Sequence, residues 1–168
     1  MRAIGYQQPS EVSRADALVD IELPTPTPTG RDILVEVRAV SVNSVDTKVR
    51  KGNAPEPGTW KVLGWDAAGV VTATGPDATL FRPGDEVFYA GAIGRPGADS
   101  EYHLVDERIV GLKPRTLGWA DAAALPLTSI TAWEAMFDHP PLRWTPRVSS
   151  WGSGGAYDDE EDATGFHG

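Results

Sequence analysis

The sequence predicts a mainly β protein with a few short helices, an α+β chain built around a closed or nearly closed β structure. Short runs rich in β-branched and aromatic residues recur along the chain, and turn residues separate them. The 14 prolines and 18 glycines favour many turns over long helices. With 168 residues the chain has the length of one globular domain, enough to bury a core.

Seven runs have the length and residue types of β-strands. They cover Arg2–Tyr6, Ala17–Leu23, Ile33–Val42, Ala67–Thr74, Glu86–Ala90, Glu101–Val105 and Ile109–Lys113. Between the second and third runs, the segment PTPTPTG (24–30) lacks ladder donors at its prolines, which predicts an extended surface connector rather than an SH3-type ligand. The segment FRPGD (81–85) predicts a tight turn that leads into the strand at Glu86.

A first short helix is predicted after the third strand. Asn43 or Ser44 can cap it, it runs through Arg50, and Gly52 ends it. Asp46 lies in its first turn, where a negative charge complements the helix dipole.

An alanine-rich helix is predicted over Trp119–Leu125, with Pro126 stopping it. A further helix is predicted over Ser129–Phe137. Its apolar residues recur at spacings of three and four and would share one face: Ile130, Trp133 and Phe137.

The sequence changes character after Asp138. Residues 139–168 have no sustained hydrophobic period and contain five consecutive acids, Asp158 to Asp162. Contiguous like charges repel and lack the alternating ligand spacing of a calcium loop, so a solvated, disordered tail is expected rather than an ion site. The predicted domain therefore covers residues 1–138, and an irregular tail covers 139–168.

Charge and composition narrow the classes of partner. A formal net charge of -9 disfavours nucleic acid, because such proteins need a basic surface to meet phosphates. No apolar run is long enough for a membrane span, and the first residues lack the apolar core of a signal peptide, so a cytoplasmic protein with no membrane partner is expected. The absence of cysteine excludes disulfides and thiolate-bound metals, and only three histidines are present.

Five blocks follow one another in a fixed order. They are VSVNSVDTKVRKG (40–52), LGWDAAGVV (63–71), FRPGDEVF (81–88), SEYHLVDERIVGLKP (100–114) and AAALPLTSITAWEAMF (122–137). Within the second block, Gly64 and Gly69 permit close backbone approach, as a barrel corner requires. Together the blocks resemble the N-terminal, GroES-like catalytic domain of the medium-chain dehydrogenase/reductase superfamily, in its zinc-type alcohol dehydrogenase-like and quinone oxidoreductase branch. The resemblance covers residues 1–138 and implies a partly open β-barrel.

The resemblance also implies an activity, the NADPH-dependent reduction of a small-molecule quinone, enone or carbonyl substrate, in a protein that can be a homo-oligomer. Zinc-dependent members place a cysteine near Asn43 and a His-Glu pair where this chain has Trp65 and Asp66. Both expected ligands are absent, so no zinc is expected. The resemblance identifies no catalytic residue.

Five residues are candidates for the site. In the family, the helix that begins at Asn43 and contains Asp46 faces the nicotinamide, and Thr128 matches a threonine whose hydroxyl approaches the nicotinamide ribose. Helix capping would equally explain Asn43, Asp46 and Thr128. Trp65 and Asp66 are candidates for the substrate cleft. For Asp66 the alternative is a structural ion pair, since a carboxylate among apolar residues needs an Arg, Lys or backbone donor.

The family places a nucleotide-binding domain after the alanine-rich helices. Here the only glycine-rich candidate is Gly152–Tyr157, which has tyrosine where the third glycine belongs, and 13 residues follow Gly155. A βαβ unit of about 30 residues does not fit there. A truncated or frameshifted chain, inactive alone, is therefore expected. The alternative is a non-enzymatic β-barrel fragment that binds a partner or self-associates; kinship in function with the GroES co-chaperonin would rest on fold analogy alone.

Overall fold

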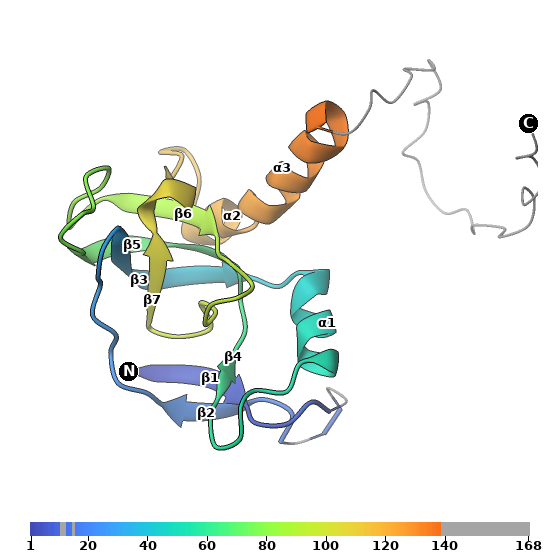
Figure 1. Cartoon of the computed structure of the whole chain (residues 1–168). Coiled ribbons are helices and arrows are strands. Elements are labelled where there is room, and N and C mark those ends of the chain that lie inside the picture. Colours follow the sequence, from blue (N-terminus) through green and yellow to red (C-terminus); the bar gives the residue numbers. More distant parts are fainter. Residues whose placement is uncertain (11–12, 15, 139–168) are drawn as a thin grey trace, which may run out of the picture.

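The structure of the protein is a computed structural model, which describes residues 1–10, 13–14 and 16–138. The expected tail at 139–168, with its acidic run and glycine-rich segment, lies outside these residues. The described residues form two antiparallel sheets (Figure 1). The smaller has the strand order β2 (Val19–Glu22), β1 (Arg2–Tyr6), β4 (Lys61–Val62). The larger has the order β7 (Tyr102–Asp106), β3 (Asp32–Ser41), β5 (Asp66–Thr74), β6 (Glu86–Ala90), β8 (Val110–Leu112).

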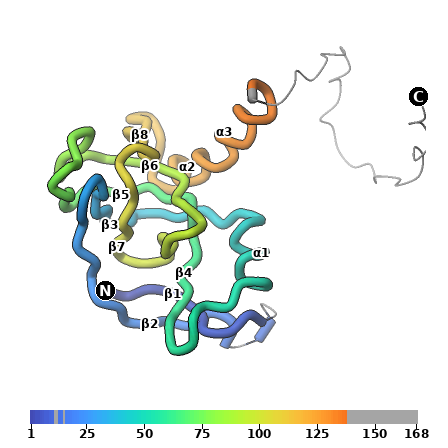
Figure 2. Tube along the Cα trace, viewed as in Figure 1, coloured from blue at the N-terminus to red at the C-terminus, as the bar shows by residue number. Residues whose placement is uncertain are grey.

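One isolated β-bridge among the described residues, between Ala3 and Ser100, joins β1 of the small sheet to the segment just before β7 of the large sheet. Figure 2 traces how the chain leaves the small sheet after β2, enters the large sheet at β3, and returns to the small sheet at β4 before β5 begins. The mainly β class with a partly open barrel is thereby confirmed. The seven predicted strands are all present: β1 and β6 have the predicted bounds, and the ends of the others are displaced by no more than two residues.

The strand β4 was missed. It has only two residues, Lys61 and Val62, too few to show any alternation of apolar and polar side chains. Its pairing with Gly5 and Tyr6 of β1 is a tertiary contact that the local sequence does not encode.

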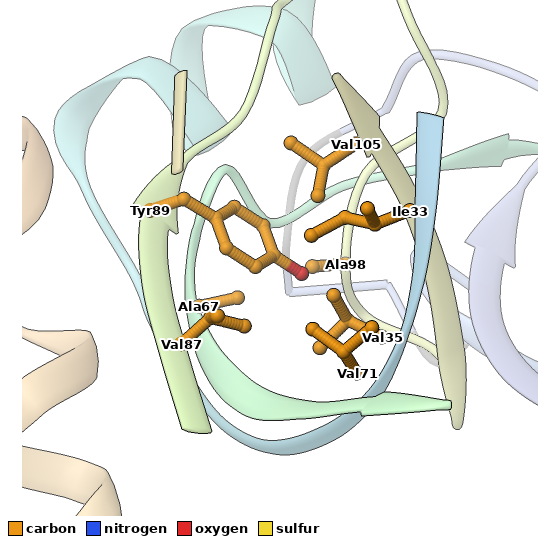
Figure 3. Packing of buried hydrophobic residues seen from close by; sticks show 8 residues of the cluster. All are labelled: Ile33, Val35, Ala67, Val71, Val87, Tyr89, Ala98 and Val105. Atoms are coloured by element: carbon orange, nitrogen blue, oxygen red, sulfur yellow. The ribbon is translucent and has the colours of Figure 1, made fainter. Parts of the chain in front are cut away.

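The main core lies inside the curled five-stranded sheet. Its members point toward one another in Figure 3 and come from four strands and one loop: Ile33, Val35, Ala67, Val71, Val87, Tyr89, Ala98 and Val105. The β3–β5 register shifts between Leu34 and Val35 and again between Val37 and Ala39. Such irregularities bend a strand and increase its twist, which lets one sheet wrap around its own core.

A second buried cluster contains Tyr6, Val49, Leu63 and Trp65, and it packs α1 (Ser44–Gly52) against the small sheet. The Tyr6 hydroxyl lies 3.1 Å from the carbonyl oxygen of Val49 and 2.8 Å from that of Asn53. The predicted start of this helix is confirmed, with Asn43 in the N-cap position. Its end lies two residues beyond the predicted Arg50, because Gly52 is the last residue of α1 and Asn53 is the C-cap.

The alanine-rich region forms α2 (Trp119–Ala123) and α3 (Pro126–Trp133), and a π-helical turn, η2 (Glu134–Asp138), follows. The predicted helix is present, but its predicted start at Ser129 is wrong, because α3 already begins at Pro126. Proline is favoured in the first turn of a helix, where its missing N–H would have no intrahelical partner. Ala122 and Ala123 pack against Ala68 on the outside of the large sheet, whereas α3 runs away from both sheets (Figure 1).

A short 3-10 helix, η1 (Glu107–Ile109), connects β7 to β8. Within the described part of the chain, no helix has both the length and the apolar character needed to cross a membrane.

Candidate functional site

The two blocks VNSVD and LGWD meet at one place in the fold. Asn43 follows the end of β3 and precedes α1, and Asp66 is the first residue of β5. The Asn43 side-chain nitrogen Nδ2 donates a hydrogen bond of 2.8 Å to Asp66 Oδ2. Residues 23 positions apart in the chain are thus in direct contact.

Asp46 is buried in the first turn of α1 and connects the same two blocks from the other side. Its Oδ2 accepts the backbone N–H of Asn43 at 2.7 Å, and its Oδ1 accepts that of Gly64 at 2.9 Å. Gly64 has φ +90°, and a Cβ there would lie 2.5 Å from Oδ1 of Asp99. Only glycine fits this position without displacing Asp99.

Asp66 is fully buried, and it binds α3 as well as Asn43. Its Oδ1 accepts the backbone N–H of Leu127 at 2.8 Å. The expected backbone donor is therefore found, whereas the expected ion pair is not: among the described residues no Arg or Lys pairs with this carboxylate. Burial raises the pKa of Asp66, the bonds from Asn43 and Leu127 oppose that rise, and the charge of Asp46 adds to it.

Thr128 lies next to Leu127 in the first turn of α3, with an exposed side chain. Its hydroxyl is 3.2 Å from the carbonyl oxygen of Ala124 and 3.1 Å from that of Leu125. The capping alternative for Thr128 is wrong, because Leu125 occupies the N-cap position. A hydroxyl that donates to the preceding turn still has lone pairs free to accept a hydrogen bond from a ligand.

Trp65 does not present its ring to the solvent. The side chain is buried with Tyr6, Val49 and Leu63, and its Nε1–H donates to the carbonyl oxygen of Ala92 at 3.2 Å. In this position the indole supports α1 and the start of β5 from beneath.

The structure also reveals Asp99, which no motif in the sequence singles out. It lies in the loop between β6 and β7 and lines a cavity of about 300 Å³ with Asp46, Val42, Leu18 and Ser10. Burial raises the pKa of Asp99 to about 6, and the nearby carboxylate of Asp46 contributes to that rise. No local pattern predicts this, since the two acids are 53 positions apart.

We expect Asp99→Asn to stabilise the fold at pH 7.5. A carboxyl whose pKa is raised from 3.8 to about 6 holds its proton more tightly when folded, so the ionised form costs stability at any pH above about 6. That cost disappears as the pH falls to about 4. The variant should gain about 1–3 kcal/mol in the free energy of unfolding at pH 7.5, and little at pH 4.

Urea unfolding at both pH values measures this effect. Asp20→Asn is the control, because Asp20 is exposed on β2 and its replacement should change stability little at either pH. A gain for Asp99→Asn that is the same at pH 4 and pH 7.5 would show that ionisation is not its cause.

A partly open antiparallel barrel, with one helix inserted after its third strand and two helices closing the described chain, defines a GroES-like domain of the dehydrogenase type. The family model "Alcohol dehydrogenase GroES-like domain" matches residues 29–127. The chain therefore belongs to this family.

Three bacterial proteins illustrate the similarity. The chain is 46% identical over 138 residues to a zinc-type alcohol dehydrogenase-like protein of Staphylococcus aureus, a match over 82% of this chain and 41% of the relative. A crystal structure of a protein described as a zinc-dependent alcohol dehydrogenase of Rhizobium etli is 67% identical, with a TM-score of 0.80, over 82% of this chain and 40% of that one. The Escherichia coli quinone oxidoreductase complexed with NADPH is 28% identical, with a TM-score of 0.71, over the same shares.

The chain spans about two fifths of the length of these relatives. The comparisons thus establish the oxidoreductase family and the type of domain. They concern small-molecule oxidoreductases and do not assign a substrate to this chain.

Proposed function

We propose that residues 1–138 form the substrate-side domain of an NADPH-dependent reductase that acts on a quinone, an enone or another carbonyl compound. The observation that carries this proposal is the contact of Asp66 with both Asn43 and Leu127. It brings the start of α1 and the start of α3 to one place, and Thr128 is the next residue of α3. These are the two helix ends that would face the nicotinamide.

Each candidate residue then has a separate task. Asn43 and Thr128 would contact the nicotinamide end of the cofactor, since both carry polar groups that are not fully buried. Asp46 would hold Asn43 in place rather than contact the cofactor, because its two oxygens already accept the backbone N–H groups of Asn43 and Gly64. NADPH would supply the hydride, and the protein would supply orientation and hydrogen-bond donors to the substrate oxygen.

We further propose that this reaction proceeds without zinc. At the position of the family's metal ligands the chain offers Asn43, Trp65 and Asp66. The indole Nε1 is only a donor, and both Asp66 oxygens are engaged by N–H groups. Among the described residues, no three His, Cys, Asp or Glu side chains are grouped so that they could hold a metal ion.

We propose that the site is complete only when a nucleotide-binding part packs against residues 1–138. The nucleotide-binding part would correspond to the portion of the relatives that the chain does not span, so the 168-residue chain by itself should not turn over substrate. A cytoplasmic protein that acts on small molecules, with no nucleic-acid partner, fits the net charge of -9.

The experiment compares the chain alone with a chimera. We expect no NADPH oxidation by the 168-residue chain with a benzoquinone or a cyclic enone as acceptor. Joining residues 1–138 to the remainder of the Staphylococcus aureus relative should produce turnover. In that chimera Thr128→Val should lower kcat/KM about 10- to 100-fold, since one transition-state hydrogen bond is lost.

The matched control is Thr131→Val, which removes an exposed hydroxyl one turn further along α3 that also bonds within the helix. A folded chimera that oxidises no NADPH contradicts the proposed function. Equal effects of Thr128→Val and Thr131→Val contradict the proposed cofactor contact.

A second candidate function, a non-enzymatic module that binds a partner or self-associates, is favoured by one observation. Ile130, Trp133, Met136 and Phe137 are all exposed on α3 and η2, and the ring centroids of Trp133 and Phe137 lie 4.5 Å apart. Sedimentation of the 168-residue chain over a range of concentrations distinguishes the two. Association that Trp133→Ser abolishes would favour the second candidate.

A further inference from the structure

We infer that Asp66 is a positioning residue that holds the start of α3 at a set place relative to the start of α1. The inference deepens the proposed function, since Asn43 and Thr128 are its two proposed cofactor contacts. The hydrogen bonds that support this inference lie among the described residues and involve no bound ligand.

The first step is the geometry of the carboxylate. One oxygen accepts Asn43 Nδ2–H and the other accepts Leu127 N–H, both at 2.8 Å. The two donors are 84 positions apart in the sequence. A carboxylate has two acceptor oxygens and no donor, so it can serve both partners at once. An asparagine at position 66 would turn an NH2 group toward one of the two donors.

The second step is the weak attachment of α3. Pro126 is the only buried residue that the structure describes in this helix. Leu127 lies in its first turn, where backbone N–H groups have no intrahelical acceptor. Asp66 supplies the acceptor that the helix itself lacks, and its negative charge lies at the positive end of the helix dipole. Of the polar contacts that fix the first turn of α3, this is the one made by a fully buried side chain.

The third step is the rigidity of the support. Asp46 joins α1 to the residues just before Asp66, through the N–H groups of Asn43 and Gly64. Asn43, Asp46, Gly64 and Asp66 thus close a ring of hydrogen bonds and backbone. Movement of Asp66 relative to α1 would break that ring. Through Leu127, the neighbouring Thr128 is held to the same support.

Hydrogen exchange of the Leu127 amide in the 168-residue chain tests the inference directly. In Asp66→Ala we expect this amide to exchange at least about tenfold faster than in the original chain, because a first-turn amide without an acceptor is open to water. The amides of Val35 and Val71, in the central strands, should keep their protection and so show that the domain remains folded.

Two further variants separate positioning from general loss of stability. Asp66→Asn keeps the size of the side chain but replaces one acceptor oxygen by an NH2 group. It should therefore either speed exchange of the Leu127 backbone amide or break the hydrogen bond to the Asn43 side-chain amide. Asp85→Ala is the control, because Asp85 also accepts a backbone N–H, that of Arg82, but in the turn before β6. Asp85→Ala should leave the exchange rate of the Leu127 amide unchanged.

Unchanged protection of Leu127 in both Asp66→Ala and Asp66→Asn would overturn the inference. In the chimera, Asp66→Asn should raise the KM for NADPH more than it lowers kcat, because it displaces two contacts without removing them. An inactive chimera would contradict the proposed function, and the exchange measurement would still decide the role of Asp66.

Discussion

Glu107→Ala is expected to lower the free energy of unfolding by about 3–5 kcal/mol, the cost of removing a fully buried side chain together with its hydrogen bonds. Glu107 is completely buried in η1. Its Oε2 accepts the backbone N–H groups of Thr79 and Leu80 at 2.8 and 2.7 Å, and Arg31 Nη2 lies 2.6 Å from its Oε1. One side chain thus connects the loop after β5, the start of β3 and the end of β7.

The loss arises mainly from the cavity that the completely buried side chain would leave and from the acceptor that two backbone N–H groups would lose. Arg31 contributes less, because its side chain is 40% exposed and regains water when the pair is broken. Urea unfolding measures this loss in the free energy of unfolding. Glu36→Ala is the matched control: Glu36 pairs with Arg38 at the surface, and its loss should cost less than about 1 kcal/mol. A cost for Glu107→Ala as small as that of the control would show that the loop does not depend on this carboxylate.

Gly69→Ala is expected to destabilise the domain by about 3 kcal/mol or more, at the upper end of the range for overpacked sites. Gly69 lies in β5 opposite Val37 of β3. A Cβ there would stand 2.2 Å from the carbonyl oxygen of Glu36 and 2.7 Å from Val35 Cγ1. The obstacle is backbone in a strand that pairs on both sides, with β5 and with β7, so it cannot yield cheaply.

The control for this variant is Gly52→Ala at the end of α1, where a Cβ would meet no atom within 4 Å. It should change stability by less than about 1 kcal/mol. Both variants are compared by thermal and urea unfolding. If Gly69→Ala were as stable as Gly52→Ala, the close approach of β3 and β5 would have to relax without cost, contrary to tight packing at this point.

The strands and α1 could be predicted from local residues because each carries its own signal. The runs alternate or are uniformly apolar, and Asn43, Asp46 and Gly52 mark the ends of α1. The role of Gly69 was also predictable, since only glycine permits a backbone to approach so closely. The start of α3 was not, because Pro126 either stops a helix or begins one, and the sequence alone does not distinguish these.

At the candidate site, the sequence identified Asn43, Asp46, Asp66 and Thr128 as polar residues in blocks that resemble those of a known family. For Asp66 it left open whether the partner is a cation or a backbone N–H group, and the structure shows the backbone N–H of Leu127 together with the side-chain amide of Asn43. A buried carboxylate must be neutralised or hydrogen-bonded, and composition cannot say whether a cation or backbone N–H groups do this. Two helix N-termini happen to meet there, which removes the need for an Arg or Lys.

The sequence by itself determined the family, the mainly β class and the order of the elements, because those depend on local residue types and on the succession of five blocks. Only the tertiary structure decided which polar groups meet: Asp66 with Leu127, Asp46 with Gly64, Asp99 near Asp46, and Glu107 with Thr79 and Leu80. The physical reason is that these contacts join residues far apart in the chain. Their geometry depends on how the two sheets curl around the core, which no local pattern records.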